Sequence, residues 1–221
     1  MAWWVVNASD RTIISHVLGT AANGIYSVAN KFPNVFINFY NILNLSWTET
    51  VSLHYNDEDR DEFLTDTMTS LVKLFVAACL GIVACMPFVF PIMVNAKYNA
   101  AYNQILILMY AMLFRVLVGL YSCVYVAQKN AKKIAYTSIS AAIINITVDL
   151  ILINKIQVFA ASLSTLVAFL SMFIVRYIDV NKTVHMRIKK PIAVGSVLLS
   201  VMLIGTYYCN NKVVQLSLIH I

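Results

Sequence analysis

The stretch WWVVNASDRTIISHVLG, from Trp3 to Gly19, is apolar enough for lipid, yet it carries Asp10 and Arg11 side by side at its centre. On an α-helix, adjacent residues point about 100° apart, so these two side chains do not face each other. Each therefore needs a partner on another helix or in water. The stretch predicts a helix that packs beside others around a polar interior.

The composition of the whole chain agrees with a membrane environment. The 221 residues are 60% hydrophobic and 12% charged, and the mean hydropathy is +0.75. Soluble domains carry about 25% charged residues, so we expect an all-α, polytopic transmembrane helical bundle. The net charge of +6 fits Lys and Arg collected in cytoplasmic loops. Without a basic patch interleaved with aromatic residues, nucleic acid is not an expected partner.

The apolar runs set the expected number of membrane spans. A spanning helix needs about 20 mostly apolar residues, and the chain offers six complete spans between two partial ones. The partial spans are residues 2–18, followed by a tight turn of small residues at 19–24, and a segment that starts at Val213. The charged stretch HYNDEDRDEF, residues 54–63, is expected to be a solvated loop or an amphipathic turn. The complete spans are expected at residues 25–53, 71–94, 105–126, 134–153, 158–178 and 191–209.

Basic residues are distributed unequally among the connecting loops. With residues 19–24 counted as the first loop, the even loops hold nine Lys and Arg residues and the odd loops hold three. Because cytoplasmic loops are enriched in Lys and Arg, the even loops are expected in the cytoplasm. The nine are Arg60, Lys129, Lys132, Lys133, Arg176, Lys182, Arg187, Lys189 and Lys190, and the three are Lys97, Lys155 and Lys212.

Five ionisable residues lie in or near the predicted spans. A charge in the bilayer core costs at least about 2.5–3.5 kcal/mol, so this set facing lipid would cost about 12–17 kcal/mol. We therefore expect them to surround a polar cavity between helices. The five are Asp10, Arg11, Lys31, Arg115 and Asp149.

Each of these residues also has a structural interpretation. Lys31 lies near a helix end, from which a long side chain reaches the headgroups, as does Lys73. Asp149 has the alternative of a bond to Asn145 or to a neighbouring helix. The alternative for Arg115 is an ion pair with Asp149, although Arg115 lies roughly 15 Å from either end of its span.

No motif of the sequence points to enzymatic chemistry. The chain has no phosphate-binding glycine loop, no G-x-S-x-G and no H-E-x-x-H, and its four histidines lack metal-ligand spacing. The connecting loops are too short to form a catalytic domain outside the membrane. We expect neither an enzyme nor a cofactor or metal site.

Several motifs together resemble the Wzx-type polysaccharide flippases. WWVVNASDRTIISHVLGTAANGIYSVANKFPNVF, from Trp3 to Phe36, contains the pattern W-W-x-x-x-x-S-D-R followed by G-x-Y-S-V-A-x-K-x-P. NAKYNAAYNQILIL, YVAQKNAKKIAYTSISAAIINITVDLILI and RYIDVNK are similar to later family segments in the same order. The resemblance extends to about Lys190. Asp149 stands where the family usually shows Asn.

The resemblance implies the C-terminal lobe of a two-lobe exporter of the multidrug/oligosaccharidyl-lipid/polysaccharide superfamily. Such proteins move undecaprenyl-pyrophosphate-linked oligosaccharides across the bacterial cytoplasmic membrane for surface polysaccharide biosynthesis. Residues 1–190 would form this lobe, and residues 191–215 would form an additional helix and turn. The expected partners are the missing N-terminal lobe of the same transporter and membrane lipids. The final LSLIHI, residues 216–221, is similar to a sequencing-adapter read-through, and we expect it to be an artefact.

The charged residues receive roles under this resemblance. Arg11, Lys31 and Arg115 are expected to bind the anionic pyrophosphate headgroup, because guanidinium and ammonium groups make charge-assisted hydrogen bonds to phosphate. Asp10 and Asp149 are expected to be ion-coupling or structural residues.

Three other functions remain open. A drug or cation antiporter of the same superfamily would suit a less cationic cavity. A membrane-embedded polysaccharide polymerase would need catalytic loops, for which the acidic DEDRDE, residues 57–62, is the candidate. A membrane scaffold without transport would leave the buried charges without a purpose.

Overall fold

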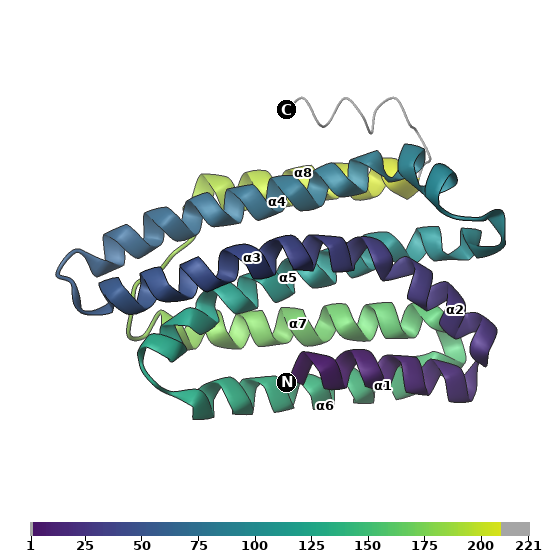
Figure 1. Cartoon of the computed structure of the whole chain (residues 1–221), viewed down its shortest axis with the longest axis horizontal. Helices are drawn as coiled ribbons and strands as arrows, with labels where there is room; N and C mark the ends of the chain where they lie inside the picture. The colour runs from purple at the N-terminus through teal and green to yellow at the C-terminus, as the bar shows by residue number, and fades with distance from the viewer. Residues whose placement is uncertain (1, 209–221) are drawn as a thin grey trace.

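A computed structural model describes residues 2–208, which fold into an all-α bundle (Figure 1). Within that range there are eight α-helices and two short 3-10 helices. They are α1 (Ala2–Val17), α2 (Thr20–Ala29), α3 (Lys31–Leu53), η1 (His54–Asn56), α4 (Arg60–Met93), η2 (Ala96–Ala101), α5 (Tyr102–Ala127), α6 (Ala131–Ile156), α7 (Val158–Val180) and α8 (Lys190–Tyr208).

Five helical segments of the described range are long and apolar enough to cross a membrane, which indicates a multi-pass membrane protein. Helix α3, predicted as a complete span, is not among them. It has 23 residues but carries Asn34, Asn38, Asn41 and Asn44 where a lipid-facing helix has apolar side chains. The five segments are Arg60–Met93, Ala96–Ala127, Ala131–Ile156, Val158–Val180 and Lys190–Tyr208.

The first turn of the chain is much tighter than its small residues predict. Helix α2 begins at Thr20, so the predicted turn over residues 19–24 is wrong, and only Leu18 and Gly19 separate α1 from α2. Gly19 has φ of 87°, a conformation that side-chain-bearing residues rarely adopt. A second break at Asn30 divides the predicted helix over residues 25–53 into α2 and α3. Pro33 lies in the first turn of α3, where a missing N–H costs nothing.

Helix α4 is longer than the apolar run that predicted it. It starts at Arg60 rather than at residue 71, because the acidic stretch forms its first turn. Asp61 and Glu62 there complement the positive end of the helix dipole. Pro87 and Pro91 lie inside the last two turns, so neither ends the helix before Met93.

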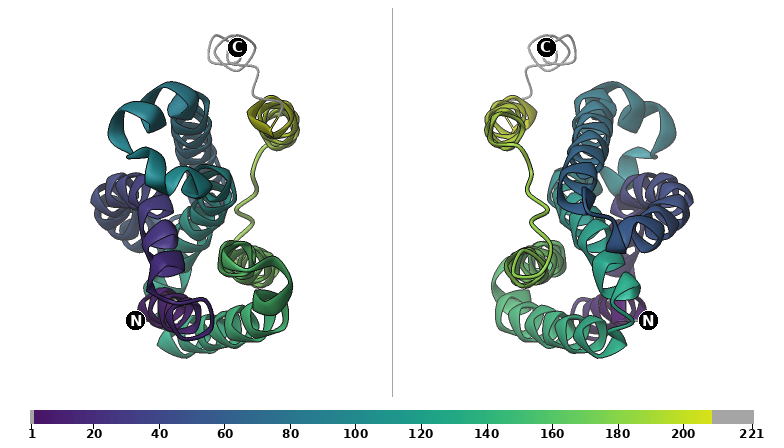
Figure 2. Two further views of the ribbon diagram at one scale, coloured as in Figure 1. Left: turned by 90° about the vertical axis from the view of Figure 1, so that its right-hand side faces the viewer. Right: turned by 90° about the vertical axis from the view of Figure 1, so that its left-hand side faces the viewer.

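Helix α5 forms the centre of the bundle. It packs against α3, α4 and α7, while α1 lies along α6, and α6 along α7 (Figure 2). Trp47 of α3 donates from Nε1 to the Leu120 carbonyl oxygen of α5 at 3.0 Å. Gly119 lets α3 approach closely, because a Cβ at this position would overlap the Tyr40 hydroxyl. These contacts hold α3 against α5, with Asn34, Asn38 and Asn41 on the exposed side and the half-buried Asn44 near Cys123 of α5.

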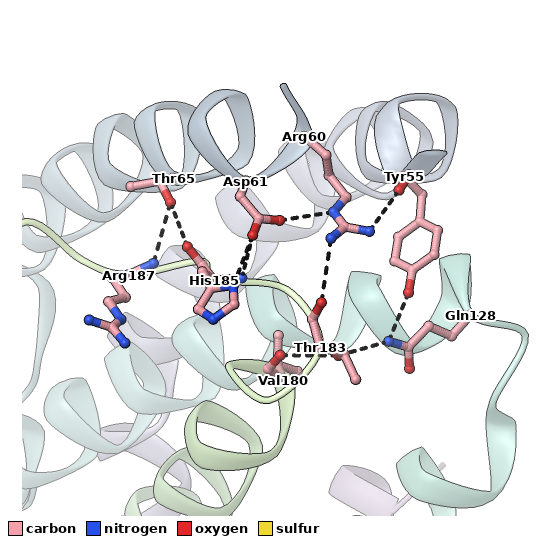
Figure 3. A network of polar contacts seen from close by, with 9 residues as sticks. All are labelled: Tyr55, Arg60, Asp61, Thr65, Gln128, Val180, Thr183, His185 and Arg187. Atoms are coloured by element: carbon pink, nitrogen blue, oxygen red, sulfur yellow. Dashed lines mark hydrogen bonds and ion pairs between the residues drawn. The ribbon is translucent and has the colours of Figure 1, made fainter. Parts of the chain in front are cut away.

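Helix α8 stands apart from α6 and α7 and packs along α4 (Figure 2). The strap of residues 181–189 connects it to α7 and is held against the first turns of α4 (Figure 3). His185 donates its backbone N–H to Asp61 at 3.1 Å, and its Nδ1 lies 3.0 Å from the same carboxylate. Asp66 forms an ion pair with Lys189 at 2.9 Å. The acidic stretch therefore contributes structural bonds.

The connections alternate between the two ends of the bundle (Figure 1). The α3–α4, α5–α6 and α7–α8 connections share one end, which is the end rich in Lys and Arg. Arg176 is an exception, because it lies within α7 and is buried rather than in a loop. Lys212, the predicted helix from Val213 and the expected artefact at residues 216–221 lie outside the described residues.

Candidate functional site

Arg11 and Arg115, which are far apart in sequence, meet in one groove, here called the outer groove. It has a volume of about 530 Å³ and lies between α1, α3 and α5. Two guanidinium groups and four asparagine amides supply its polar groups, and no carboxylate lines it. The lining residues are Asn7, Ala8, Arg11, Asn34, Ile37, Asn38, Asn41 and Arg115.

Helix geometry explains why α3 presents a polar strip to this groove. Asn34, Asn38 and Asn41 follow one another at intervals of four and three residues, so they lie on one face. All three are exposed, and so is Arg11. Amide and guanidinium groups on an exposed face of a membrane bundle indicate contact with water, a polar ligand or another protein segment rather than with lipid tails.

Lys31 does not line the outer groove, although it was grouped with Arg11 and Arg115. It is the first residue of α3 and is exposed. The spacing of three residues to Asn34 places it one turn beyond the asparagine strip. Lys31 thus lies at the end of the groove rather than within it.

Asp10 belongs to a separate group of buried polar side chains on α1, α2, α6 and α7, here called the carboxylate pocket. It is fully buried, and its Oδ2 accepts hydrogen bonds from Tyr26 at 2.7 Å and from Thr165 at 2.8 Å. Its Oδ1 has no hydrogen-bond partner among the described residues. As expected for neighbours on a helix, Asp10 and Arg11 face different surroundings.

Asp149 shares the carboxylate pocket and is also fully buried. It lies within electrostatic reach of Asp10, and neither of its oxygens has a hydrogen-bond partner in residues 2–208. The predicted alternatives of a bond to Asn145 and an ion pair with Arg115 are therefore wrong. Asn145 instead donates to Ser164 at 3.1 Å and to Thr165 at 3.4 Å.

Two buried carboxylates side by side cannot both remain charged without a compensating proton or cation. Three of their four oxygens have no partner in the described structure, and Asn145 Oδ1 lies nearby in the same network through Ser9 at 3.4 Å. Oxygen ligands of this kind suit a hard cation. The pocket has the chemistry to take up a proton or a small cation.

Arg176 is the polar residue that sequence reasoning missed. It begins a run of charged residues, and for this reason the sequence suggested a loop. The helical spacing gave the opposite signal, because Phe169, Met172 and Arg176 recur at intervals of three and four on one buried face of α7.

The chain matches no protein-family model, no curated protein and no solved structure with which it was compared.

Proposed function

We propose that the chain is part of a flippase for lipid-linked oligosaccharides, in which the outer groove holds the pyrophosphate headgroup. The meeting of Arg11 and Arg115 in one groove of a membrane bundle is the observation that carries this proposal. Guanidinium groups bind phosphate oxygens bidentately, so two of them suit a diphosphate. The asparagine strip adds amide donors and acceptors for the first sugar hydroxyls.

The exposed side of the groove supports a two-lobe arrangement. Transporters built from two helical halves place their substrate between the halves near the membrane midplane. A second helical lobe facing α1 and α3 would cover Arg11 and the asparagine strip. In this proposal, the groove forms one wall of the central cavity.

The carboxylate pocket supports a coupling role for Asp10 and Asp149. Uptake of a proton or cation there would neutralise the pair and change the packing of α1 against α6 and α7, which the two carboxylates join. Because α1 also carries Arg11, the two sites are linked through one helix. A shift of α1 would couple ion uptake to the binding of the headgroup in the outer groove.

A cation antiporter is less well supported, because the two arginines of the groove repel a cationic drug. The polymerase alternative is weakened by the acidic stretch, in which Asp61 is bonded to His185 and Arg60. Neither alternative accounts for the asparagine strip beside the two arginines.

Ligand binding tests the proposal directly. The purified chain in neutral-lipid nanodiscs should bind farnesyl diphosphate, a short-chain lipid diphosphate, and prefer it to the cation tetraphenylphosphonium. Arg11→Gln and Arg115→Gln should each weaken this binding at least tenfold, or about 1.4 kcal/mol. Lys132→Gln, which removes an exposed charge at the basic end, is the matched control. Unchanged binding in both arginine variants, or preference for the cation, would refute the proposal.

A further inference from the structure

A second cavity of the bundle shares Arg115 with the outer groove. This inner cavity has a volume of about 200 Å³, whereas one water molecule takes up about 30 Å³ of liquid. It is lined by residues of α1, α3, α5, α6 and α7. Its polar lining consists of Tyr40, Arg115, Ser122, Ser138 and Arg176.

Arg176 reaches this cavity from α7 with 2% of its surface exposed. Its guanidinium donates to Thr137 Oγ1 at 3.0 and 2.8 Å, to Ser138 Oγ at 3.1 Å and to Ser122 Oγ. Longer bonds of 3.4 Å reach the carbonyl oxygens of Val118 and Ile134. Every one of these acceptors is a neutral oxygen, so the bonds position the group without cancelling its charge.

The electrostatics of the cavity call for a negative charge. Two guanidinium groups line one small space inside a membrane bundle, where like charges repel and where desolvation is costly. No Asp or Glu forms an ion pair with Arg176 in the described part of the chain. The two fully buried acidic groups of the described bundle, Asp10 and Asp149, belong to the carboxylate pocket instead.

One hydroxyl group of the wall can add a donor. Ser138 accepts a bond from Arg176, which leaves its own O–H to point to a ligand. The O–H groups of Tyr40 and Ser122 already donate, to Asn44 Oδ1 and to the Val118 carbonyl oxygen, each at 2.6 Å. The N–H groups of Arg176 also have acceptors, so Arg176 contributes its positive charge while Ser138 supplies a hydrogen bond to a tetrahedral oxyanion.

We propose that the inner cavity is a second anion site, which binds a tetrahedral oxyanion of the phosphate class between Arg115 and Arg176. Because Arg115 lines both spaces, it is the residue through which an anion passes from the outer groove to the inner cavity. The ligand is either free phosphate or the phosphate end of a lipid headgroup. The site stands apart from the proposed function, since inorganic phosphate would bind there whatever the groove carries.

Thermal unfolding of the purified full chain in detergent tests this site. Inorganic phosphate should raise Tm in a saturable way relative to gluconate at equal ionic strength, because a ligand that binds only the folded state stabilises it. Ala141→Leu fills the cavity from α6 without changing a charge and should weaken phosphate binding at least tenfold. Ala142→Leu, the same change one residue further along, points elsewhere and should leave binding unchanged.

Two further arms separate the alternatives. Arg11→Gln removes only the outer groove's own guanidinium, so phosphate should still stabilise this variant. Farnesyl phosphate in place of phosphate identifies the source: if Ala141→Leu weakens its binding as well, the lipid headgroup reaches the inner cavity, and if it does not, free phosphate is the ligand.

Three results would overturn the inner site, and each differs from a failure of the proposed function. The first is that phosphate does not raise the Tm of the wild-type chain. The second is that phosphate raises the Tm of Ala141→Leu as much as that of the wild-type chain. The third is that only Arg11→Gln loses the stabilisation by phosphate. None of them affects the preference for farnesyl diphosphate over tetraphenylphosphonium, which tests the outer groove.

Discussion

The buried charges of this bundle are sorted into two regions that satisfy them in opposite ways. On one side, Arg176 makes hydrogen bonds to three hydroxyl groups and two carbonyl oxygens, although no carboxylate neutralises it. On the other side, Asp149 is buried without a hydrogen bond in the described structure. A bundle optimised only for stability would pair the two signs. Their separation is the basis of the two binding roles proposed above, one for an anion and one for a proton or cation.

The strongest test of this contrast keeps the positive charge of residue 176 but removes the planar guanidinium group that makes the hydrogen bonds. Arg176→Lys cannot reach acceptors on both α5 and α6 and loses at least two charge-assisted hydrogen bonds, each worth about 1.5–3 kcal/mol. We expect a loss of about 3 kcal/mol in the free energy of unfolding, measured by thermal melting in detergent. Arg187→Lys, at an exposed arginine of the strap, is the control and should not change Tm. An unchanged Tm in Arg176→Lys would show that the hydrogen-bonded cage does not hold the side chain.

The same comparison predicts that replacing Asp149 makes the fold more stable, whereas replacing Arg176 makes it less stable. Asp149→Asn keeps the shape and removes one of two carboxylates that repel each other, at a position where neither oxygen has a hydrogen-bond partner in the described structure. Relieving an unsatisfied buried group is worth about 1–3 kcal/mol, so the variant should melt higher than the wild-type chain in buffer free of alkali cations. Asp179→Asn should melt lower, because Asp179 accepts bonds from Lys133 at 2.7 Å and Tyr125 at 2.9 Å. A lower Tm in Asp149→Asn would mean that Asp149 is held by a partner.

The sequence predicted that polar sites exist better than it predicted which residues come together in each of them. Asp10, Arg11 and Arg115 stood out because charges interrupt apolar runs, and this signal is local. The hydrogen bond of Asp10 with Thr165 and its electrostatic interaction with Asp149 depend on α1 lying beside α6 and α7, which no local pattern specifies. The length of the turn at Gly19 was overestimated, because small residues suit both turns and tightly packed helices.

The two remaining errors have a common cause. Arg176 was read with the charged run after it, although its helical phase belonged to the apolar residues before it. Helix α3 was read as a span because its apolar residues dominate the count, although Asn34, Asn38 and Asn41 share one face and line the groove. In both cases the average composition of a segment hid the face that its side chains occupy.

The smallest expected effect concerns charges outside the apolar core, where the structure pairs opposite signs directly. Asp61 is bonded to Arg60 at 2.9 Å and to His185, and its side chain is 35% exposed (Figure 3). Exposed ion pairs contribute about 0.2–1 kcal/mol and are screened by salt, so Asp61→Asn should lower the free energy of unfolding by less than about 1 kcal/mol. Hydrogen exchange of the strap should nevertheless become faster, since His185 loses an acceptor for its backbone N–H.

Glu58→Gln, which removes an exposed acidic charge a few residues earlier, is the control and should leave both Tm and exchange unchanged. A loss in Asp61→Asn as large as that in Arg176→Lys would contradict the contrast between the two kinds of charge. In that case the strap, rather than the buried guanidinium, would be the principal polar support of the fold, because it alone connects α8 to α7 and holds both against α4. A small loss in Tm together with faster exchange would instead show that paired exposed charges fix a local segment without supporting the whole fold.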